Sequence, residues 1–349
     1  MFDHINISGF RGIKETQIDG LKQVNLFFGK NNCGKSSLLD AIFLISGLSN
    51  PKLPFNINIL RDYRRLGKSD INLDFYNLDT NVPISITANN DESRKLKIRL
   101  LEVSDQEVDL LGSGNNVSSS QSDSKYGLVL EYGIDGVTHR SSIVFTSSGD
   151  NEIKQEVRLD KEYEEKLNCR YLNSKFDFYA SISGLVNILK NKDEHFLIDS
   201  LRFIEPRLVD FVLSENEVLV DIGLDQRIPI NMMGDGARKM LAILTSIYEC
   251  ENGIVLLDEI SNGFHYSVMK DMWLAIFKSA IKNDVQVFAT THDNDSIKGM
   301  RDAALSLNGL GADIVASYKL QKKHDGILNA YHYSLDSLDF SINQEIEVR

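Results

Sequence analysis

The sequence predicts an α/β fold with a mixed central sheet, an antiparallel β meander and a helical lobe, and it contains no long heptad segment that would form a coiled coil. Three patterns predict this fold class. Between residues 24 and 47, a short apolar run, a glycine-rich loop and an apolar helix follow one another. From residue 71 to residue 159, apolar and polar residues alternate with the period of a strand, as in Ile84–Ala88. From residue 163, apolar residues recur at the three- and four-residue spacings of a helix.

The composition restricts the classes of function. The chain has 38 lysines and arginines against 50 aspartates and glutamates, a net charge of -12. This balance argues against a generally basic protein that coats nucleic acid, although a local basic groove is compatible with it. The three cysteines, at positions 33, 169 and 250, are too few and too scattered for a disulfide framework or a zinc site. With no signal peptide and no apolar run of bilayer length, we expect a cytoplasmic protein without membrane contact.

Several elements are predicted from local patterns. His4–Ile13 is expected to form a first strand and a turn, and Gln17–Leu21 its hairpin partner. Ile71–Phe75 alternates and is expected to open the meander. Gly112–Ser124 is rich in serine, glycine and asparagine, which predicts a mobile loop. Val218–Ile230 is expected to contain a second hairpin.

The first chemical motif is G-x-x-x-x-G-K-S, the phosphate-binding P-loop, which lies between a predicted buried strand, Val24–Phe28, and an apolar helix that ends at Gly47. In this arrangement backbone N–H groups wrap the phosphates and the helix N-terminus adds positive potential. We expect Lys35 to reach the β- and γ-phosphates and the Ser36 hydroxyl to bind Mg²⁺. The predicted loop comprises Gly29, Lys30, Asn31, Asn32, Cys33, Gly34, Lys35, Ser36 and Ser37.

Two further predicted strands end in polar residues. Gly253–Leu257 leads into Asp258 and Glu259, which is the Walker B pattern. Burying an unpaired carboxylate is costly, so these two side chains are expected to bind a ligand or pair with another group. We expect Asp258 to hold Mg²⁺ and Glu259 to polarise the attacking water. Val285–Ala289 leads to His292, at the strand end where open α/β sheets bind ligands, so we expect His292 to contact the γ-phosphate.

Five segments occur in a fixed order, namely Phe10-Arg11-Gly12, the P-loop, Met233-Gly234-Asp235-Gly236, Leu257–His265 and Thr290-Thr291-His292. In this order they resemble ABC-type ATPases of the RecF/SMC/OLD group. They are most similar to the short OLD-like stand-alone ATPases of bacterial phage-defence systems. The resemblance covers both ends of the chain and is vague over residues 69–179.

The resemblance implies a head-to-tail homodimer with two ATP molecules at the interface. Each ATP would be held by the P-loop of one subunit and by the signature turn, Gly234-Asp235-Gly236, of the other. Asn262–His265 would cross the interface, His292 would be the switch histidine, and Arg11 would touch the nucleotide. Gly234 stands where a serine is usual and Asp235 adds a negative charge, so we expect slow hydrolysis. No Q-loop glutamine can be assigned.

On this basis the chain is expected to be one ABC-type ATPase unit over residues 1–349. Its expected segments are 1–70 with the first strands, P-loop and helix, 71–160 with the β-rich part and the loop 112–124, 161–230 as a helical lobe, and 231–349 with the signature turn, Walker B, the switch histidine and the C-terminal part.

Three functions are compatible with these motifs. The first is an ATP-binding and ATP-hydrolysing switch whose dimerisation controls a separately encoded nuclease or toxin in anti-phage defence, since residues 293–349 carry no acidic cluster of a nuclease. The second is a RecF-like DNA-repair ATPase that clamps DNA directly through the basic clusters Arg61–Lys68 or Lys319–Lys323. The third is a scaffold that binds ATP without turnover. The acidic composition favours the first over the second.

Overall fold

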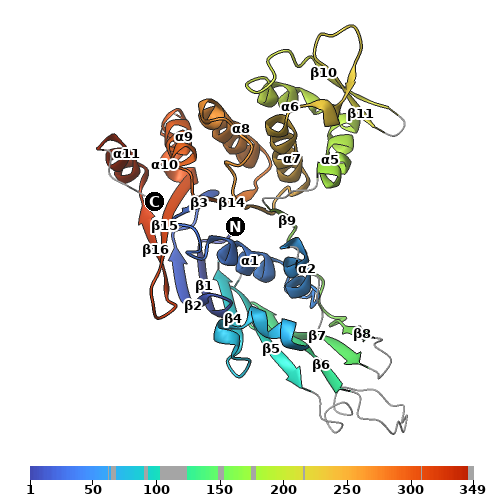
Figure 1. Ribbon diagram of the computed structural model, residues 1–349, viewed down its shortest axis with the longest axis vertical. Helices are drawn as coiled ribbons and strands as arrows, with labels where there is room; N and C mark the ends of the chain where they lie inside the picture. Colours follow the sequence, from blue (N-terminus) through green and yellow to red (C-terminus); the bar gives the residue numbers. More distant parts are fainter. Residues whose placement is uncertain are drawn as a thin grey trace.

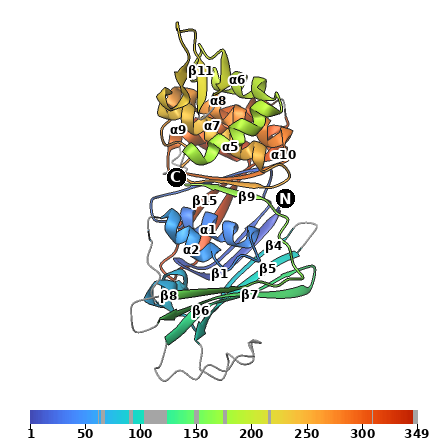
Figure 2. The same ribbon diagram turned by 90° about the vertical axis from the view of Figure 1, so that its right-hand side faces the viewer.

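The protein is described here by a computed structural model, which covers all residues except 62, 64–67, 90–92, 103–123, 148–152, 174–177, 215–216, 308 and 345–349. The described part consists of two large sheets and two layers of helices (Figure 1). Seen from the side, one sheet lies at one end of the molecule, a helical layer lies between the two sheets, and the remaining helices cover the outer face of the other sheet (Figure 2). The predicted α/β class is confirmed.

The first sheet has seven antiparallel strands in the order β2-β1-β4-β5-β6-β7-β8. The strands are β1 His4–Phe10, β2 Ile13–Asp19, β4 Ile84–Asn89, β5 Ser93–Glu102, β6 Ser124–Ile134, β7 Val137–Ser147 and β8 Ile153–Arg158. The N-terminal hairpin and the meander therefore form one sheet. The predicted mobile loop lies outside the described residues, apart from Ser124, which begins β6.

The prediction of a strand at Ile71–Phe75 is wrong. Most of this stretch is helical, with α3 at Lys68–Ile71 and short 3-10 turns at Asn72–Asp74 and Tyr76–Leu78, while Phe75 between the turns is extended and forms a single antiparallel bridge with Phe10. Ile71 and Phe75 are buried while Leu73, between them, is 42% exposed. In a strand, residues 71, 73 and 75 would share one face, so the exposure of Leu73 is inconsistent with the strand that the alternation predicted.

The second sheet has six strands in the order β16-β15-β3-β14-β13-β9 and is parallel except for β16. The strands are β3 Val24–Phe28, β9 Cys169–Leu172, β13 Ile254–Leu257, β14 Gln286–Thr291, β15 Val315–Lys322 and β16 Leu328–Tyr333. Strand β9 lies within a segment expected to be helical. It has only four residues, all half-buried, so it shows no periodicity that would reveal a strand.

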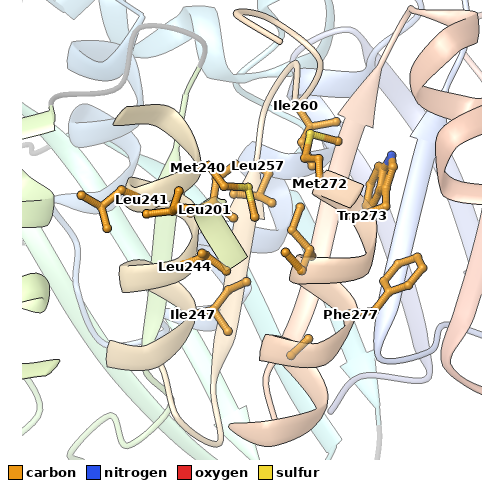
Figure 3. Packing of buried hydrophobic residues seen from close by; sticks show 14 of the residues in the cluster. Leu201, Met240, Leu241, Leu244, Ile247, Leu257, Ile260, Met272, Trp273 and Phe277 are labelled. Atoms are coloured by element: carbon orange, nitrogen blue, oxygen red, sulfur yellow. The ribbon is translucent and has the colours of Figure 1, made fainter. Parts of the chain in front are cut away.

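The two faces of the six-stranded sheet belong to two separate cores. Along β13, Val255 and Leu257 face one core, and Ile254 and Leu256 face the other, as the alternation of a strand requires. Helix α1 (Lys35–Ser46) fills the space between the two sheets and packs on both. The opposite face is covered by α7 (Asp235–Glu249), α8 (Met269–Lys282) and α9 (Asn294–Leu305). Figure 3 shows residues of α7 and α8 packed around Leu257 and Ile260.

The remaining elements are shorter. The helical lobe contains α5 Phe178–Lys190 and α6 Glu194–Leu201, and beside them lies a three-stranded sheet of β10 Asp210–Leu213, β11 Val218–Asp221 and β12 Ile228–Pro229. The other helices are α2 Leu53–Leu60, α10 Gly311–Ile314 and α11 Leu335–Asn343, with 3-10 turns at Ile230–Met232 and Tyr266–Val268. Among the described residues, no helix combines the length and apolar character that crossing a bilayer requires. None continues into a coiled coil.

Candidate functional site

The P-loop adopts a backbone that its glycines make possible. Strand β3 is buried along its whole length and delivers the chain to Gly29, with φ +153°, and the loop ends at Gly34, with φ +107°, which caps α1. A Cβ atom on Gly29 would lie 2.6 Å from the Leu320 carbonyl oxygen, so no larger residue fits there. Asn32 takes the left-handed conformation at φ +61°, which asparagine tolerates better than most residues.

The ammonium of Lys35 is buried inside this loop. Its Nζ donates to the carbonyl oxygens of Gly29 at 3.0 Å and Lys30 at 3.2 Å, and it lies 3.9 Å from Oε1 of Glu259. The loop therefore presents one fixed positive charge next to the end of β13. A charge held in this way can neutralise phosphate oxygens without further reorganisation.

Ser36 and Asp258 meet although they are 222 residues apart in the sequence: Ser36 Oγ donates to Asp258 Oδ1 at 3.2 Å. Thr290, at the end of the adjacent strand, donates to the same oxygen at 2.6 Å. A hydroxyl beside a carboxylate is the hard oxygen donor set that Mg²⁺ accepts when nucleotide phosphates and water complete its coordination. No group of three or more His, Cys, Asp or Glu side chains that could hold a metal by themselves occurs in the described part of the chain. These residues thus fit a nucleotide-bound Mg²⁺.

Glu259 and His292 form a contact pair at the ends of neighbouring parallel strands. His292 Nδ1 and Glu259 Oε2 are 2.6 Å apart. A carboxylate can only accept, so the proton of this bond lies on Nδ1 and Nε2 is the nitrogen that can turn to a ligand. Glu259 itself has φ +51°, and its backbone N–H donates to Thr290 Oγ1 at 2.9 Å.

Sequence reasoning did not identify Lys239. This α7 lysine is buried, and its Nζ donates to the carbonyl oxygens of Glu259 at 2.9 Å and Asn262 at 2.8 Å. Burial lowers the pKa of Lys239 to about 8, although the negative charges of Glu259 and Asp258 act in the opposite direction. A lysine on an amphipathic helix is usually solvated, so the sequence contained no signal for this contact.

The sequence also did not indicate that Asn173 lies near the end of the Walker B strand. It directly follows Leu172, which pairs with Leu257 at the end of the Walker B strand. The backbone N–H of Asp258 donates to the Leu172 carbonyl oxygen at 2.9 Å, so β9 ends beside Asp258. The Asn173 amide donates to the Leu60 carbonyl oxygen at 2.7 Å.

The signature turn lies at the start of α7. Asp235 pairs with Arg238 on the same helix and is 81% exposed. A Cβ on Gly234 would meet nothing within 4 Å, whereas one on Gly236 would lie 3.1 Å from the Gly263 carbonyl oxygen. The outer side of the turn is therefore open, and its inner side is packed against the segment that follows Walker B.

Arg11 is held in an ionic network behind the P-loop helix. Its guanidinium donates to Asp40, to Asp74 at 3.0 Å and to Asn58 at 2.6 Å. Asp40, on α1, also accepts from Arg61 at 2.6 Å. A nucleotide contact by Arg11 stays a prediction, because these bonds direct its donors to the protein.

The two basic clusters differ in their surroundings. Arg61 is directed to Asp40, and residues 64–67 lie outside the described residues. The other cluster lines a cavity of about 670 Å³ whose opposite wall is the outer side of the P-loop. Its lysine and histidine lining residues are Lys30, Lys319, Lys322, Lys323 and His324.

Fold and site together define a P-loop ATPase. Residues 1–203 match the model of a family described as AAA ATPase domain, and the chain belongs to this family. Residues 159–297 match a second model, described as AAA domain, putative AbiEii toxin, Type IV TA system.

Individual relatives agree with this assignment. An ATP/GTP phosphatase of Helicobacter pylori is 23% identical over 329 residues, which cover 85% of this chain and 87% of that protein. The DNA replication and repair protein RecF of Lactobacillus acidophilus is 41% identical over 44 residues, 13% of this chain and 12% of RecF. Among solved structures, an SMC head bound to the C-terminal winged-helix domain of ScpA has a TM-score of 0.52 at 13% identity, and covers 97% of this chain and 99% of that one. The last likeness concerns the fold alone.

Proposed function

We propose that this ATPase is a switch that dimerises head to tail around two ATP molecules and controls a separately encoded effector in anti-phage defence. The observation that supports the dimer is the exposed outer side of the signature turn. Its outer side has no neighbour within 4 Å of a Cβ placed on Gly234. Two exposed apolar residues are close in sequence to the turn or its contacts: Met232, 72% exposed, precedes the turn, and Tyr266, 66% exposed, follows Phe264, which lies beside Gly236. Such a surface suits contact with a second subunit.

The proposed chemistry is hydrolysis of the γ-phosphate. Lys35 neutralises phosphate oxygens, and Ser36 and Asp258 hold the Mg²⁺ that supplies Lewis-acid stabilisation when bound. Glu259 orients the attacking water and takes its proton. His292 contacts the Glu259 carboxylate through Nδ1 and would turn its other ring nitrogen to the γ-phosphate. Turnover is expected to be slow, because Gly234 offers no hydroxyl to the γ-phosphate.

The defence role rests on the resemblance to short OLD-like ATPases, and the family model that names a putative AbiEii toxin is compatible with it. The effector would be a nuclease or a toxin encoded nearby. We expect a tagged protein, expressed with its native flanking genes, to retain a stoichiometric partner in a pull-down with ATP. The partner should be lost from the Lys35→Ala form. Recovery of the ATPase alone would contradict the effector proposal.

The dimer is tested by Glu259→Gln, which keeps the shape of the side chain and removes the base. With ATP and Mg²⁺ this variant should elute as a dimer in gel filtration, since bound ATP is no longer consumed. Adding Lys35→Ala to it should restore the monomer, which is the matched control. A Glu259→Gln protein that stays monomeric with saturating ATP would refute the dimer.

A second candidate is a RecF-like ATPase that clamps DNA, and the lysine-lined cavity beside the P-loop favours it. Duplex DNA binding should then weaken steeply with salt, and Lys322→Ala with Lys323→Ala should reduce the salt slope. Absence of salt-sensitive binding would exclude this candidate.

A further inference from the structure

One buried cation has no part in the chemistry described above. Lys239 is 7% exposed, donates to the carbonyl oxygens of Glu259 and Asn262, and lies 5.7 Å from the ring centroid of Phe264. Burying an ammonium is costly unless acceptors replace the lost water. Both of its carbonyl acceptors belong to the tight turn that follows the Walker B strand. This lysine therefore joins α7 to that turn.

The turn is held from two sides. On the side of β14, the Glu259 N–H donates to Thr290 Oγ1 and the Ile260 N–H donates to the Thr290 carbonyl oxygen, both at 2.9 Å. On the side of α7, Lys239 holds the Glu259 carbonyl oxygen at 2.9 Å. Glu259 has a left-handed φ of +51°, which a non-glycine residue keeps only when its surroundings enforce it. The direction of its carboxylate depends on these bonds.

Helix α7 and the turn also meet at their backbones, since a Cβ on Gly236 would lie 3.1 Å from the Gly263 carbonyl oxygen. A shift of the signature helix must therefore displace the turn as well. We propose that Lys239 is a positioning residue that transmits the position of the signature turn to the Glu259 carboxylate. This inference rests on the proposed function, because the signature turn affects hydrolysis only when a second subunit engages it.

The first experiment compares Lys239→Met, Lys239→Arg and the matched control Lys278→Met, which removes an exposed lysine from α8. Lys239→Met should lower kcat about 10- to 100-fold, as expected for a misplaced catalytic group, and change the Kd for ATP by less than about 3-fold. Lys239→Arg should restore much of kcat, and Lys278→Met should match the wild type. Unchanged kcat in Lys239→Met would overturn the proposal. If Lys239→Met fails to fold in a thermal melt, Lys239→Gln, whose shorter uncharged side chain cannot replace both ammonium contacts, takes its place with the same expected loss of kcat.

The second experiment places Lys239→Met in the Glu259→Gln background. A residue that acts on Glu259 should leave the ATP-dependent dimer intact in the double variant. Loss of the dimer there would assign Lys239 to the signature turn itself and overturn the proposal. A Glu259→Gln single variant that remains monomeric would instead refute the proposed function, so the two failures are distinguishable.

Discussion

Nδ1 of His292 lies 2.6 Å from Oε2 of Glu259, and Oε1 of the same carboxylate lies 3.9 Å from the Lys35 ammonium. Glu259 thus lies between two groups from different strands, β3 through the P-loop and β14 through His292. This arrangement suits a base that must accept a proton while phosphate charge is neutralised nearby.

Replacing His292 with alanine should lower kcat about 10- to 100-fold, because it removes both the group that orients Glu259 and the proposed γ-phosphate contact. ATP affinity should change little, because the P-loop supplies most of the expected phosphate contacts. His292→Gln, which can still donate to the carboxylate, should lose less. Phosphate release and binding of a fluorescent nucleotide would measure the two quantities. Wild-type turnover in His292→Ala would contradict the role.

Replacing Lys35 with alanine should abolish ATP binding and phosphate release, since the only buried ammonium within the described P-loop is lost. Lys52→Ala, which removes an exposed lysine before α2, is the control and should bind ATP normally. Isothermal titration calorimetry of ATP into each variant would measure the binding. Phosphate release that persists in Lys35→Ala would show that turnover comes from another site.

The network at Asp40 should be a main contributor to stability. Asp40 is fully buried and accepts from Arg11, Arg61 and Tyr171. Asp40→Asn would remove the carboxylate that faces Arg61 and leave Arg11 with Asp74 alone, and breaking a buried pair costs at most about 3–5 kcal/mol. Urea unfolding should show this loss, while Asp3→Asn at an exposed position should leave the midpoint unchanged. Equal urea midpoints for Asp40→Asn and the wild type would mean that the network does not stabilise the fold.

Alkylation of Cys33 should block the nucleotide site, because the thiol lies in the P-loop and is buried. Burial raises the pKa of the Cys33 thiol above its usual 9.0, so the reactive thiolate is scarce at neutral pH and the alkylation rate should increase as the pH rises through that pKa. ATP should protect Cys33. Intact-protein mass spectrometry would measure the alkylation, and an ATP-binding assay on the same samples would measure the block.

Cys33→Ser is the control for that experiment. It should bind ATP and keep that binding after treatment with the reagent. If the reagent abolishes ATP binding in Cys33→Ser as well, the block arises elsewhere, and Cys169 and Cys250 are the remaining cysteines.

The P-loop and the Walker B strand could be predicted from the sequence because each is local. A buried strand, two glycines and a lysine at fixed spacing specify the phosphate loop, and the φ values at Gly29 and Gly34 agree with that spacing. Likewise, β13 is a continuous apolar run and β14 has an apolar centre and is buried along its length, and polar residues that end adjacent parallel strands must lie together.

Other features depend on residues that are distant in the sequence. The strand predicted at Ile71–Phe75 is helical up to Asp74, and there Asp74 pairs with Arg11, a partner that no local pattern indicates. Strand β9 is too short for periodicity and exists through its pairing with β13.

What the sequence by itself determined is the P-loop, the acids Asp258 and Glu259 at the end of one strand and His292 at the end of the next, since local patterns place each of them. The tertiary structure alone decided that Ser36 meets Asp258, that His292 meets Glu259 and that Lys239 holds the turn. The physical reason is burial. Whether a polar side chain is solvated or paired depends on what the fold packs against it, and a helix pattern that leaves Lys239 free to point to water does not contain that information.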